Sequence, residues 1–388
     1  MLGRRVSSRA MKAYLDNMAS TPLDPRVSDA MMPYLSGLPG NPHATAHPFG
    51  ARQAKAVEEA RGRVARALGV RTGQVVFTPS ATAANNLAVL GVAMGRRRRG
   101  NHVLVSAIEH PSVLGPARHL GTSGFEVEEV RCDGAGVVDP DEVRQRLRPE
   151  TILVSIMAAN NEVGTIQMVW DVARICHEAS VLVHCDASQA PGKVDLSDFL
   201  GADFITLSSH KVYGPKGAAA LVVRAPGGFR PRPILFGGGQ EGGLWPGTLN
   251  TAAVVGFGLA MELAVSEREA DCARVSAFRE RLLLGIQEAL PGSRANGART
   301  VPHCLSITLN RVSGETALAM LSRAGVAASL GSACETAAAT PSHVLLAMGL
   351  PPAECRRTLR FGLGRFTTGE DIDAALEVFT AMGRACQV

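Results

Sequence analysis

The sequence predicts an α/β protein with a large domain built on a mainly parallel, mixed sheet and a smaller α+β domain. Short runs of β-branched apolar residues alternate with longer helix-like segments from about residue 50 to residue 225, which is typical of parallel strands joined by crossover helices. The 388 residues also exceed the usual size of one hydrophobic core, so a second unit is expected. The glycine-rich stretch LFGGGQEGGLWPGTLNT interrupts the alternation before that second unit.

Five segments are expected to form the strands of the large sheet, because each is short, apolar and rich in β-branched residues. In chain order they are 74–77 (QVVF), 102–108 (HVLVSAI), 151–157 (TILVSIM), 181–187 (VLVHCDA) and 203–209 (DFITLSS). The segments 77–95 and 169–180 have a helical pattern and are the expected crossovers.

A long amphipathic segment, 253–290, is expected to be one helix that carries the domain boundary near residue 262. We therefore assign residues 15–261 to the large domain, and residues 1–14 with 262–388 to the small domain. The run SLGSACETAAATPS lacks helical or strand periodicity and predicts a mobile loop at about 330–342.

The composition is that of an ordinary globular protein. Hydrophobic residues make up 46% of the chain and charged residues 19%, and no apolar run reaches the roughly 20 residues that cross a bilayer. The basic N-terminus lacks the apolar stretch of a secretory signal, so a cytoplasmic location is expected, and Met11 is an alternative start. The 8 cysteines contain no CxxC pair, which argues against a disulfide framework and against a metal site.

The run GRRRRG, Arg96 to Arg99, contributes much of the formal net charge of +5. It lies between a helix-like segment and a strand-like one. We interpret it as a solvated loop rather than a nucleic-acid or acidic-partner surface, since most charge runs are solvated.

Polar residues stand at the end of each predicted strand. They are Thr78 and Ser80; Glu109 and His110; Asn160 and Asn161; Asp186; and Ser208, His210 and Lys211. Because ligands of open parallel sheets bind outside the carboxyl ends of the strands, these side chains are expected to converge.

A lysine and a carboxylate at adjacent strand ends fit pyridoxal 5'-phosphate (PLP). Lys211 is expected to hold the cofactor as a Schiff base, while Asp186 keeps the ring nitrogen protonated. The segment TPSATAANN predicts a strand, a turn and a helix N-terminus, where backbone N–H groups and the hydroxyl of Thr82 can face a phosphate. Ser208 and His210 can add donors.

The sequence resembles the cysteine desulfurases of group I (NifS/IscS type), PLP enzymes of fold type I in the class V aminotransferase family. The matching segments occur in family order along the chain. They are YLDNMASTPLDPRV, GNPHATAHPFG, SAIEHPSV, NNEVGTIQ, HCDASQAPGKV, SSHKVYGPKG, GSACETAAATPSHVL and LRFGLGRFTT.

The resemblance implies a role for each matching site residue. Lys211 holds PLP; Asp186 pairs the ring nitrogen; Gln189 binds the ring hydroxyl; His110 stacks on the ring; Ala81, Thr82, Ser208 and His210 hold the phosphate with Thr248 of a neighbouring subunit; Asn161 and Arg360 bind the substrate carboxylate. Asn161 also lies beside the cofactor, and a homodimer is implied.

The resemblance further implies that L-cysteine is converted to L-alanine and that Cys334 keeps the sulfur as a persulfide for an acceptor such as an iron–sulfur scaffold. His110 is a candidate for handling the substrate thiol. Two alternatives remain open: a PLP-dependent β-lyase or selenocysteine lyase that does not need Cys334, and a non-catalytic interaction protein. The segments Ser80–Ala83 (SATA) and 245–248 (WPGT) depart from the family's common GATE and RSGT, which bears on cofactor affinity and the dimer edge.

Overall fold

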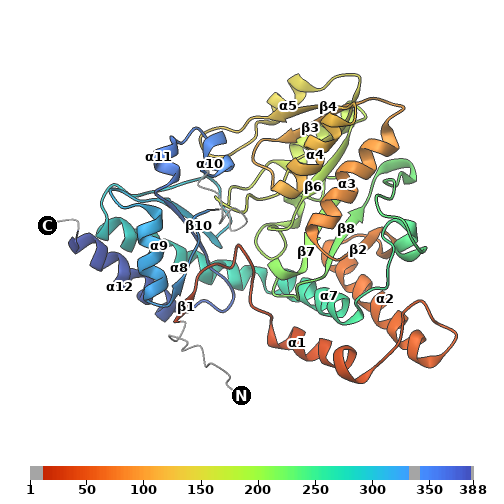
Figure 1. The fold of residues 1–388 in the computed structure, drawn as a ribbon, viewed down its shortest axis with the longest axis horizontal. Helices are drawn as coiled ribbons and strands as arrows, with labels where there is room; N and C mark the ends of the chain where they lie inside the picture. The colour runs from red at the N-terminus through yellow and green to blue at the C-terminus, as the bar shows by residue number, and fades with distance from the viewer. Residues whose placement is uncertain (1–11, 332–340, 386–388) are drawn as a thin grey trace, which may run out of the picture.

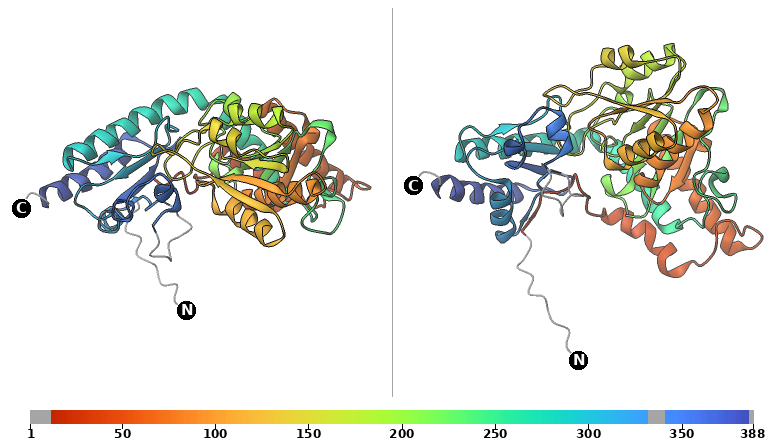
Figure 2. Two further views of the ribbon diagram at one scale, coloured as in Figure 1. Left: turned by 90° about the horizontal axis from the view of Figure 1, so that it is seen from above. Right: turned by 45° about the horizontal axis from the view of Figure 1, so that its top comes forward.

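The computed structural model describes residues 12–331 and 341–385. Cys334 and nearly all of the loop expected at about 330–342 lie outside these ranges. Within them, the chain forms two parts that lie side by side (Figures 1 and 2). No helix in the described ranges combines the length and the apolar character needed to cross a membrane.

The larger part is built on a seven-stranded mixed sheet. In spatial order its strands are β2 (Val75–Thr78), β8 (Ala219–Val223), β7 (Phe204–Ser208), β6 (Leu182–Asp186), β5 (Thr151–Ser155), β3 (His102–Ser106) and β4 (Glu126–Val130). All five predicted strands are confirmed, and β8 runs in the opposite direction to the other six strands. The strands β8 and β4 were not predicted.

Helices cover both faces of this sheet, which explains why its strands other than the edge strand β4 are mostly apolar. One face packs against α3 (Ala81–Arg96) and α4 (Pro111–Thr122). The other packs against α2 (Pro48–Leu68), α5 (Pro140–Arg146), α6 (Val169–Glu178) and α7 (Thr251–Ser266), and α1 (Pro25–Met32) lies on α7 (Figure 1). The two predicted crossover helices, α3 and α6, are thus confirmed.

The smaller part has its own buried cluster. Its strands are β1 (Ala13–Tyr14), β9 (Arg294–Ala295), β10 (Cys304–Thr308), β11 (Val326–Ala327) and β12 (Thr358–Gly362). Its helices are α8 (Arg268–Ala289), α9 (Gly314–Arg323), α10 (His343–Ala347), α11 (Pro352–Cys355) and α12 (Gly369–Ala385). The chain's first strand, β1, pairs in parallel with β11, so the N-terminal segment begins in this part before it crosses to α1 (Figure 1).

Short turns of 3₁₀ or π helix complete the fold. They are η1 (Pro33–Gly37), η2 (Thr72–Gln74), η3 (Leu196–Asp198), η4 (Ser209–Lys211), η5 (Pro226–Gly228) and η6 (Gln240–Gly243).

The expectation of one continuous helix over 253–290 is wrong. The chain breaks at Glu267, which has φ −99° and ψ 2° between α7 and α8, and whose carboxylate contacts Arg26 and Arg365. The buried side chains of α7 belong to the core of the larger part, whereas those of α8, apart from Asp271, belong to the core of the smaller part. We therefore propose that the domain boundary lies at this break, close to the residue 262 inferred from the sequence.

Arg365 ties the two parts together through a buried charge network. Its guanidinium contacts Asp24 at 2.9 Å, Glu267 at 3.1 Å and Asp271 at 2.8 Å. Its Cζ lies 4.6 Å from the centroid of the Tyr213 ring. The Arg365 side chain is only 8% exposed. Asp24 and Glu267 also pair with Arg26, and Asp271 also pairs with Arg274. Those two arginines are 50% and 42% exposed, so Arg365 is the buried cation that the three carboxylates share.

The substitution Arg365→Met is expected to lower the free energy of unfolding by about 3 kcal/mol, because the buried carboxylates of Asp24 and Asp271 lose their buried partner and keep only partly exposed arginines. Arg281→Met is the matched control, since Arg281 pairs with Asp373 but is 48% exposed, and it is expected to cost less than about 1 kcal/mol. Urea denaturation of both variants checks this, and equal losses would contradict the assigned role of Arg365.

Candidate functional site

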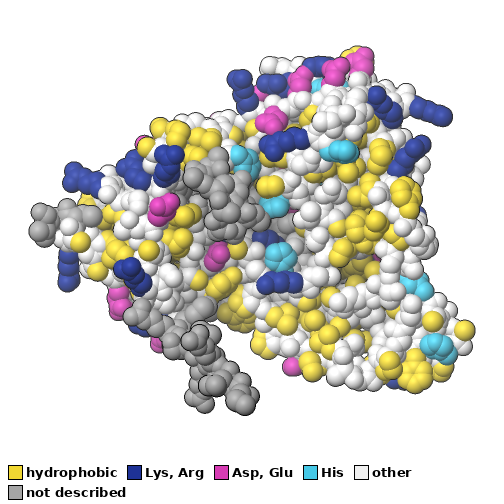
Figure 3. All heavy atoms as spheres, viewed as in Figure 1, with side chains coloured by type: hydrophobic (Ala, Val, Ile, Leu, Met, Phe, Trp, Pro, Cys, Tyr) yellow, Lys and Arg dark blue, Asp and Glu magenta, His cyan; other side chains and the backbone are white. Residues whose placement is uncertain are grey.

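The carboxyl ends of the parallel strands border a pocket between the two parts of the molecule. Its lining residues are Met18, Ala19, Ser80, Ala81, Thr82, His110, Ser112, Met157, Ala159, Asn161, Asp186, Ser188, Gln189, Ser208, His210, Lys211 and Arg360. Figure 3 views this side of the molecule, where histidine side chains lie beside the hollow between the two parts. Seven of the ten polar residues predicted at the strand ends therefore lie together in the lining of this pocket.

Lys211 enters the pocket from η4, directly after strand β7. Its Nζ donates hydrogen bonds to the backbone oxygens of Met18, at 2.6 Å, and Ala19, at 2.8 Å. Both acceptors belong to the segment that runs from β1 to α1. The N-terminal segment thus fixes the position of the amine.

Asp186 ends strand β6 and is 6% exposed. Its Oδ2 accepts a hydrogen bond from Asn85 Nδ2 at 2.7 Å, and its Oδ1 accepts one from the Ser188 backbone N–H at 2.9 Å. Asn85 lies on α3, is fully buried, and also donates to Ser112 at 2.8 Å. Asn85 lies in the predicted phosphate-binding segment TPSATAANN, but the sequence predicted no role for this residue.

His110 caps the N-terminus of α4, and its Nδ1 accepts the Ser112 backbone N–H at 3.1 Å. The Ser112 hydroxyl lies 2.7 Å from the same Nδ1. Burial lowers the pKa of His110, although Asp186 opposes this shift. The ring is therefore neutral at pH 7 and, with Nδ1 accepting, carries its proton on Nε2.

An anion cradle forms where α3 begins, beside the end of β7. Ser80 caps α3 by accepting the Ala83 N–H at 3.1 Å, and the remaining N–H groups of the first turn have no acceptor within the helix. Burial, followed by the charge of Lys211, lowers the pKa of His210 to about 4. His210 thus offers this end of the pocket a hydrogen bond rather than a charge.

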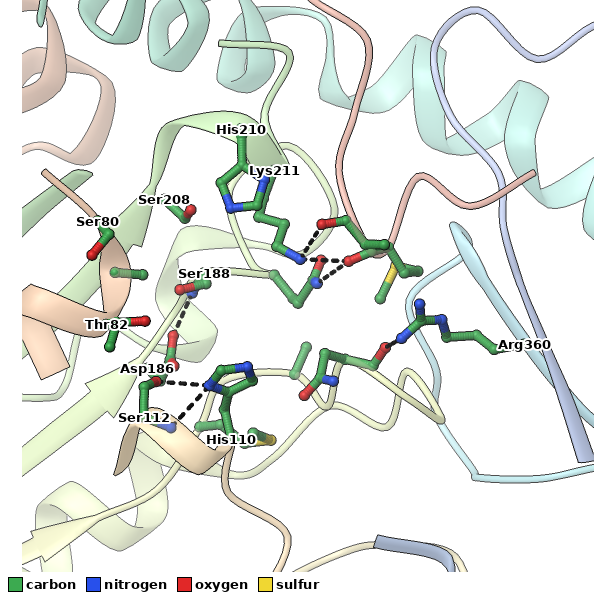
Figure 4. Close-up of a pocket in the computed structure, with 17 residues that line it drawn as sticks. Ser80, Thr82, His110, Ser112, Asp186, Ser188, Ser208, His210, Lys211 and Arg360 are labelled. Carbon is green, nitrogen blue, oxygen red and sulfur yellow. Dashed lines mark hydrogen bonds between the residues drawn. The ribbon is translucent and has the colours of Figure 1, made fainter. Parts of the chain in front are cut away.

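Arg360 reaches the opposite end of the pocket from β12 (Figure 4). It is 1% exposed, and its two Nη atoms contact Asp16 Oδ1 at 2.9 Å and the Asn161 backbone oxygen at 2.9 Å. This burial shows that the ion pair between Arg360 and Asp16 is not an ordinary surface salt bridge. Asp16, its carboxylate partner, was not identified from the sequence.

Gln189 lines the pocket between these ends and is 3% exposed. Its Nε2 donates to the Met18 backbone oxygen at 2.9 Å, and its Oε1 accepts from Lys193 Nζ at 2.7 Å. The amide is therefore fixed from both sides. Lys193, like Asn85 and Asp16, was not identified from the sequence.

Some polar strand ends serve the fold instead of the pocket. Thr78 donates to the Ser80 backbone oxygen, Glu109 accepts from the Met157 backbone N–H, and Asn160 accepts the N–H groups of the next turn. Thr248 is exposed and does not line the pocket of its own chain, so its role in a neighbouring subunit stays a prediction, as does that of Cys334.

The pocket fits PLP by the chemistry of its donors and acceptors. A lysine amine, a buried carboxylate and a group of hydroxyls at a helix N-terminus are the functional groups that this cofactor requires. Among the described residues, the buried Ser188 hydroxyl has no hydrogen-bond partner although it lines the pocket. Figure 4 shows the hydroxyls of Ser80, Thr82 and Ser208 at one end and Arg360 at the other, with Lys211 between them.

The substitution Asp186→Asn is expected to lower turnover by at least about 100-fold while cofactor binding persists, because an amide cannot keep a ring nitrogen protonated. Steady-state rates and cofactor absorbance measured on the same sample check this. Asp195→Asn, whose parent side chain is 58% exposed, is the control. A near-normal rate for Asp186→Asn would mean that Asp186 only caps the loop after β6.

Comparison with known proteins agrees with this geometry. Cysteine desulfurase IscS 1 of Archaeoglobus fulgidus is 41% identical over 94% of this chain and 95% of its own length. A solved structure titled NIFS-like protein superimposes with a TM-score of 0.89 at 35% identity, over 96% of this chain and 99% of that one. Another, titled SspA in complex with cysteine, gives a TM-score of 0.80 at 34% identity, over 92% of this chain and 100% of that one.

The sequence model of the family described as aminotransferase class-V matches residues 13–375, which include every described residue of the pocket. With the relatives above and the PLP-compatible pocket, this match identifies the chain as a member of the class V aminotransferase family.

Proposed function

We propose that this protein is a PLP-dependent cysteine desulfurase that converts L-cysteine to L-alanine and holds the removed sulfur on Cys334. One observation carries the proposal: a single pocket has an anion cradle at one end, a buried arginine at the other, and Lys211 and Asp186 in its lining. This is the arrangement needed to hold both a phosphorylated cofactor and an amino acid. The names and identities of the relatives support the assignment of cysteine as the substrate.

The cofactor, when bound, supplies a conjugated ring that takes up the electron pair left by a broken bond at the substrate. Lys211 holds the cofactor and then accepts the substrate's α proton, because its amine is the base beside the bound amino acid. Asp186 keeps a proton on the ring nitrogen, and the hydrogen bond from Asn85 to Oδ2 holds that carboxylate in place.

The guanidinium of Arg360 binds the substrate carboxylate, and the side chain of Asn161 assists. Because a guanidinium matches a carboxylate with two parallel N–H groups, the buried Arg360 favours an anionic group at this end of the pocket. The hydrogen bond that Arg360 donates to the Asn161 backbone oxygen holds the two residues next to each other. His110, neutral and protonated on Nε2, covers the ring and donates to the sulfur side of the substrate.

The sulfur transfer step uses Cys334. Its thiolate attacks the substrate sulfur, the bond between that sulfur and Cβ breaks, and the electron pair goes to Cβ, which takes up a proton to complete the methyl group of alanine. Cys334 then carries a persulfide, which an acceptor thiol can remove. No external oxidant is needed. The two sulfur atoms are oxidised to the persulfide level, and Cβ is reduced because it gains the electron pair of the broken C–S bond.

A homodimer completes the site in this proposal. Thr248 is exposed and outside its own pocket, and large apolar side chains are exposed on neighbouring segments of the larger part, including Phe236 at 84%, Leu35 at 60% and Phe49 at 58%. Burying such side chains is favourable. A second copy placed here would cover them and bring Thr248 to the partner's phosphate cradle.

A sulfur-acceptor protein, such as an iron–sulfur scaffold, is the partner proposed to dock near the Cys334 loop, and the proposed location is the cytoplasm. We do not propose nucleic acid as a partner of the Arg96–Arg99 run. The guanidinium of Arg96 lies 4.8 Å from the centroid of the Phe229 ring, and that of Arg97 lies 4.4 Å from the centroid of the Phe125 ring. These two arginines therefore pack on the protein itself.

Incubation of the purified protein with L-cysteine and a reducing thiol tests the proposal. Alanine and sulfide are expected in equal amounts. Pyruvate and ammonia in place of alanine would indicate the β-lyase alternative, and a cofactor spectrum that does not respond to cysteine would indicate a non-catalytic protein.

A further inference from the structure

Lys193 is a buried lysine directly behind the pocket. It follows β6 on the same loop as Gln189 and is 6% exposed. Its Nζ donates to Gln189 Oε1 at 2.7 Å and to the backbone oxygen of Lys211 at 3.3 Å. Lys193 does not itself line the pocket, so any effect on the site must pass through these two residues.

The contact with Lys193 decides which way the Gln189 amide faces. Its Oε1 meets the lysine donor, and its Nε2 meets the Met18 carbonyl at 2.9 Å. A flipped amide would set its N–H groups against the N–H groups of Lys193 and its oxygen against the oxygen of Met18, losing two buried hydrogen bonds at once. Lys193 therefore selects one of the two orientations.

In the selected orientation Gln189 is a donor toward the pocket. An amide nitrogen carries two hydrogens, and Met18 accepts only one of them in the described contacts. The same Met18 oxygen also accepts from Lys211 Nζ at 2.6 Å. One carbonyl thus places the Gln189 donor and the Lys211 amine side by side.

We propose that Lys193 is a positioning residue that fixes Gln189 as a hydrogen-bond donor to the cofactor's ring oxygen and thereby sets the acidity of the linkage between Lys211 and the cofactor. The inference rests on the proposed cofactor role of the pocket. A donor on the ring oxygen weakens that oxygen's hold on the proton of the neighbouring Lys211 nitrogen. Loss of the donor therefore strengthens that hold and raises the pKa of the linkage.

The hold of Lys193 on Gln189 depends on the protonation state of the amine. Burial, followed by the charge of Lys211, lowers the pKa of Lys193 to about 7, while the neighbouring Cys304 and Cys272 oppose the shift. An ammonium has only donors, whereas a neutral amine also has a lone pair that can accept. Lys193 therefore selects the Gln189 orientation most strongly below neutral pH, and the Met18 carbonyl favours the same orientation above it.

An absorbance titration of the PLP-loaded protein tests this inference without any measurement of turnover. Lys193→Met and Gln189→Leu are each expected to raise the pKa of the Lys211–cofactor linkage by about one unit, the equivalent of one buried hydrogen bond. The double variant is expected to show no larger shift than either single variant, because Lys193 acts through Gln189. Lys193→Gln, which keeps an N–H donor, is expected to shift the pKa less than Lys193→Met and serves if the Met variant does not fold.

Three outcomes overturn the inference: an unchanged pKa in Lys193→Met, shifts that add in the double variant, or a shift in Lys193→Gln as large as that of the Met variant. The first means that Gln189 keeps its orientation unaided, and the others mean that Lys193 acts by packing or by charge. Failure of the proposed function looks different, since a wild-type protein with no visible cofactor band has no linkage to titrate.

Discussion

Replacing Lys211 by alanine is expected to abolish turnover of L-cysteine and to remove the visible absorbance of the bound cofactor. Lys211 both attaches the cofactor and moves the substrate proton, and the proton transfer alone is worth about 10²- to 10⁴-fold in rate. Its amine is held in the pocket by the carbonyls of Met18 and Ala19 at 2.6 and 2.8 Å. A change at this position therefore removes a placed nucleophile rather than a surface charge.

The matched control is Lys55→Ala, because the Lys55 side chain is 78% exposed on α2, and this variant is expected to keep both colour and activity. Lys193 is the nearest competitor, with its Nζ 3.3 Å from the Lys211 backbone oxygen, but it points to Gln189 and lies outside the pocket lining. A coloured, active Lys211→Ala protein would contradict the assignment.

Cys334→Ala is expected to bind PLP and L-cysteine but to release less than about 1% of the wild-type alanine, because no other thiol can take the sulfur. The described cysteines support this selectivity. Burial raises the pKa of Cys132 to about 11, of Cys176 to about 12 and of Cys304 to about 11, so these thiols are protonated and poor nucleophiles at neutral pH.

Burial also raises the pKa of the thiols of Cys185, Cys272 and Cys355. Cys386 lies outside the described residues, which makes Cys386→Ala the informative control. It is expected to form alanine at the wild-type rate. If Cys334→Ala forms alanine at a normal rate, the persulfide mechanism on Cys334 is wrong and the selenocysteine lyase alternative, which does not need Cys334, replaces it.

The fold could be predicted from the sequence where the signal is local. The five apolar strands were found because both of their faces are buried. The edge strand β4 has the sequence EVEEV and a mostly uncovered face, so it lacks that signal. The antiparallel strand β8 follows the turn after Lys211 without a crossover helix, and the break at Glu267 depends on arginines distant in sequence.

The site residues also divide into those that a local sequence signal predicts and those that depend on contacts distant in sequence. Residues at strand ends, such as Asp186 and Lys211, could be predicted because topology alone brings them together. Asn85, Asp16 and Lys193 could not, because each matters through a side-chain contact across the fold: with Asp186, with Arg360 and with Gln189, respectively. In the sequence, nothing distinguishes these three residues from ordinary helix, loop or surface residues.

The position of the transferred sulfur tests the central claim most directly. After brief treatment with L-cysteine and blocking of free thiols, mass spectrometry of the digested protein should find one additional sulfur atom on the peptide that contains Cys334 and none on the peptides of the other seven cysteines. An additional sulfur on Cys386 or on any buried cysteine, or on no cysteine while alanine accumulates, would contradict the account.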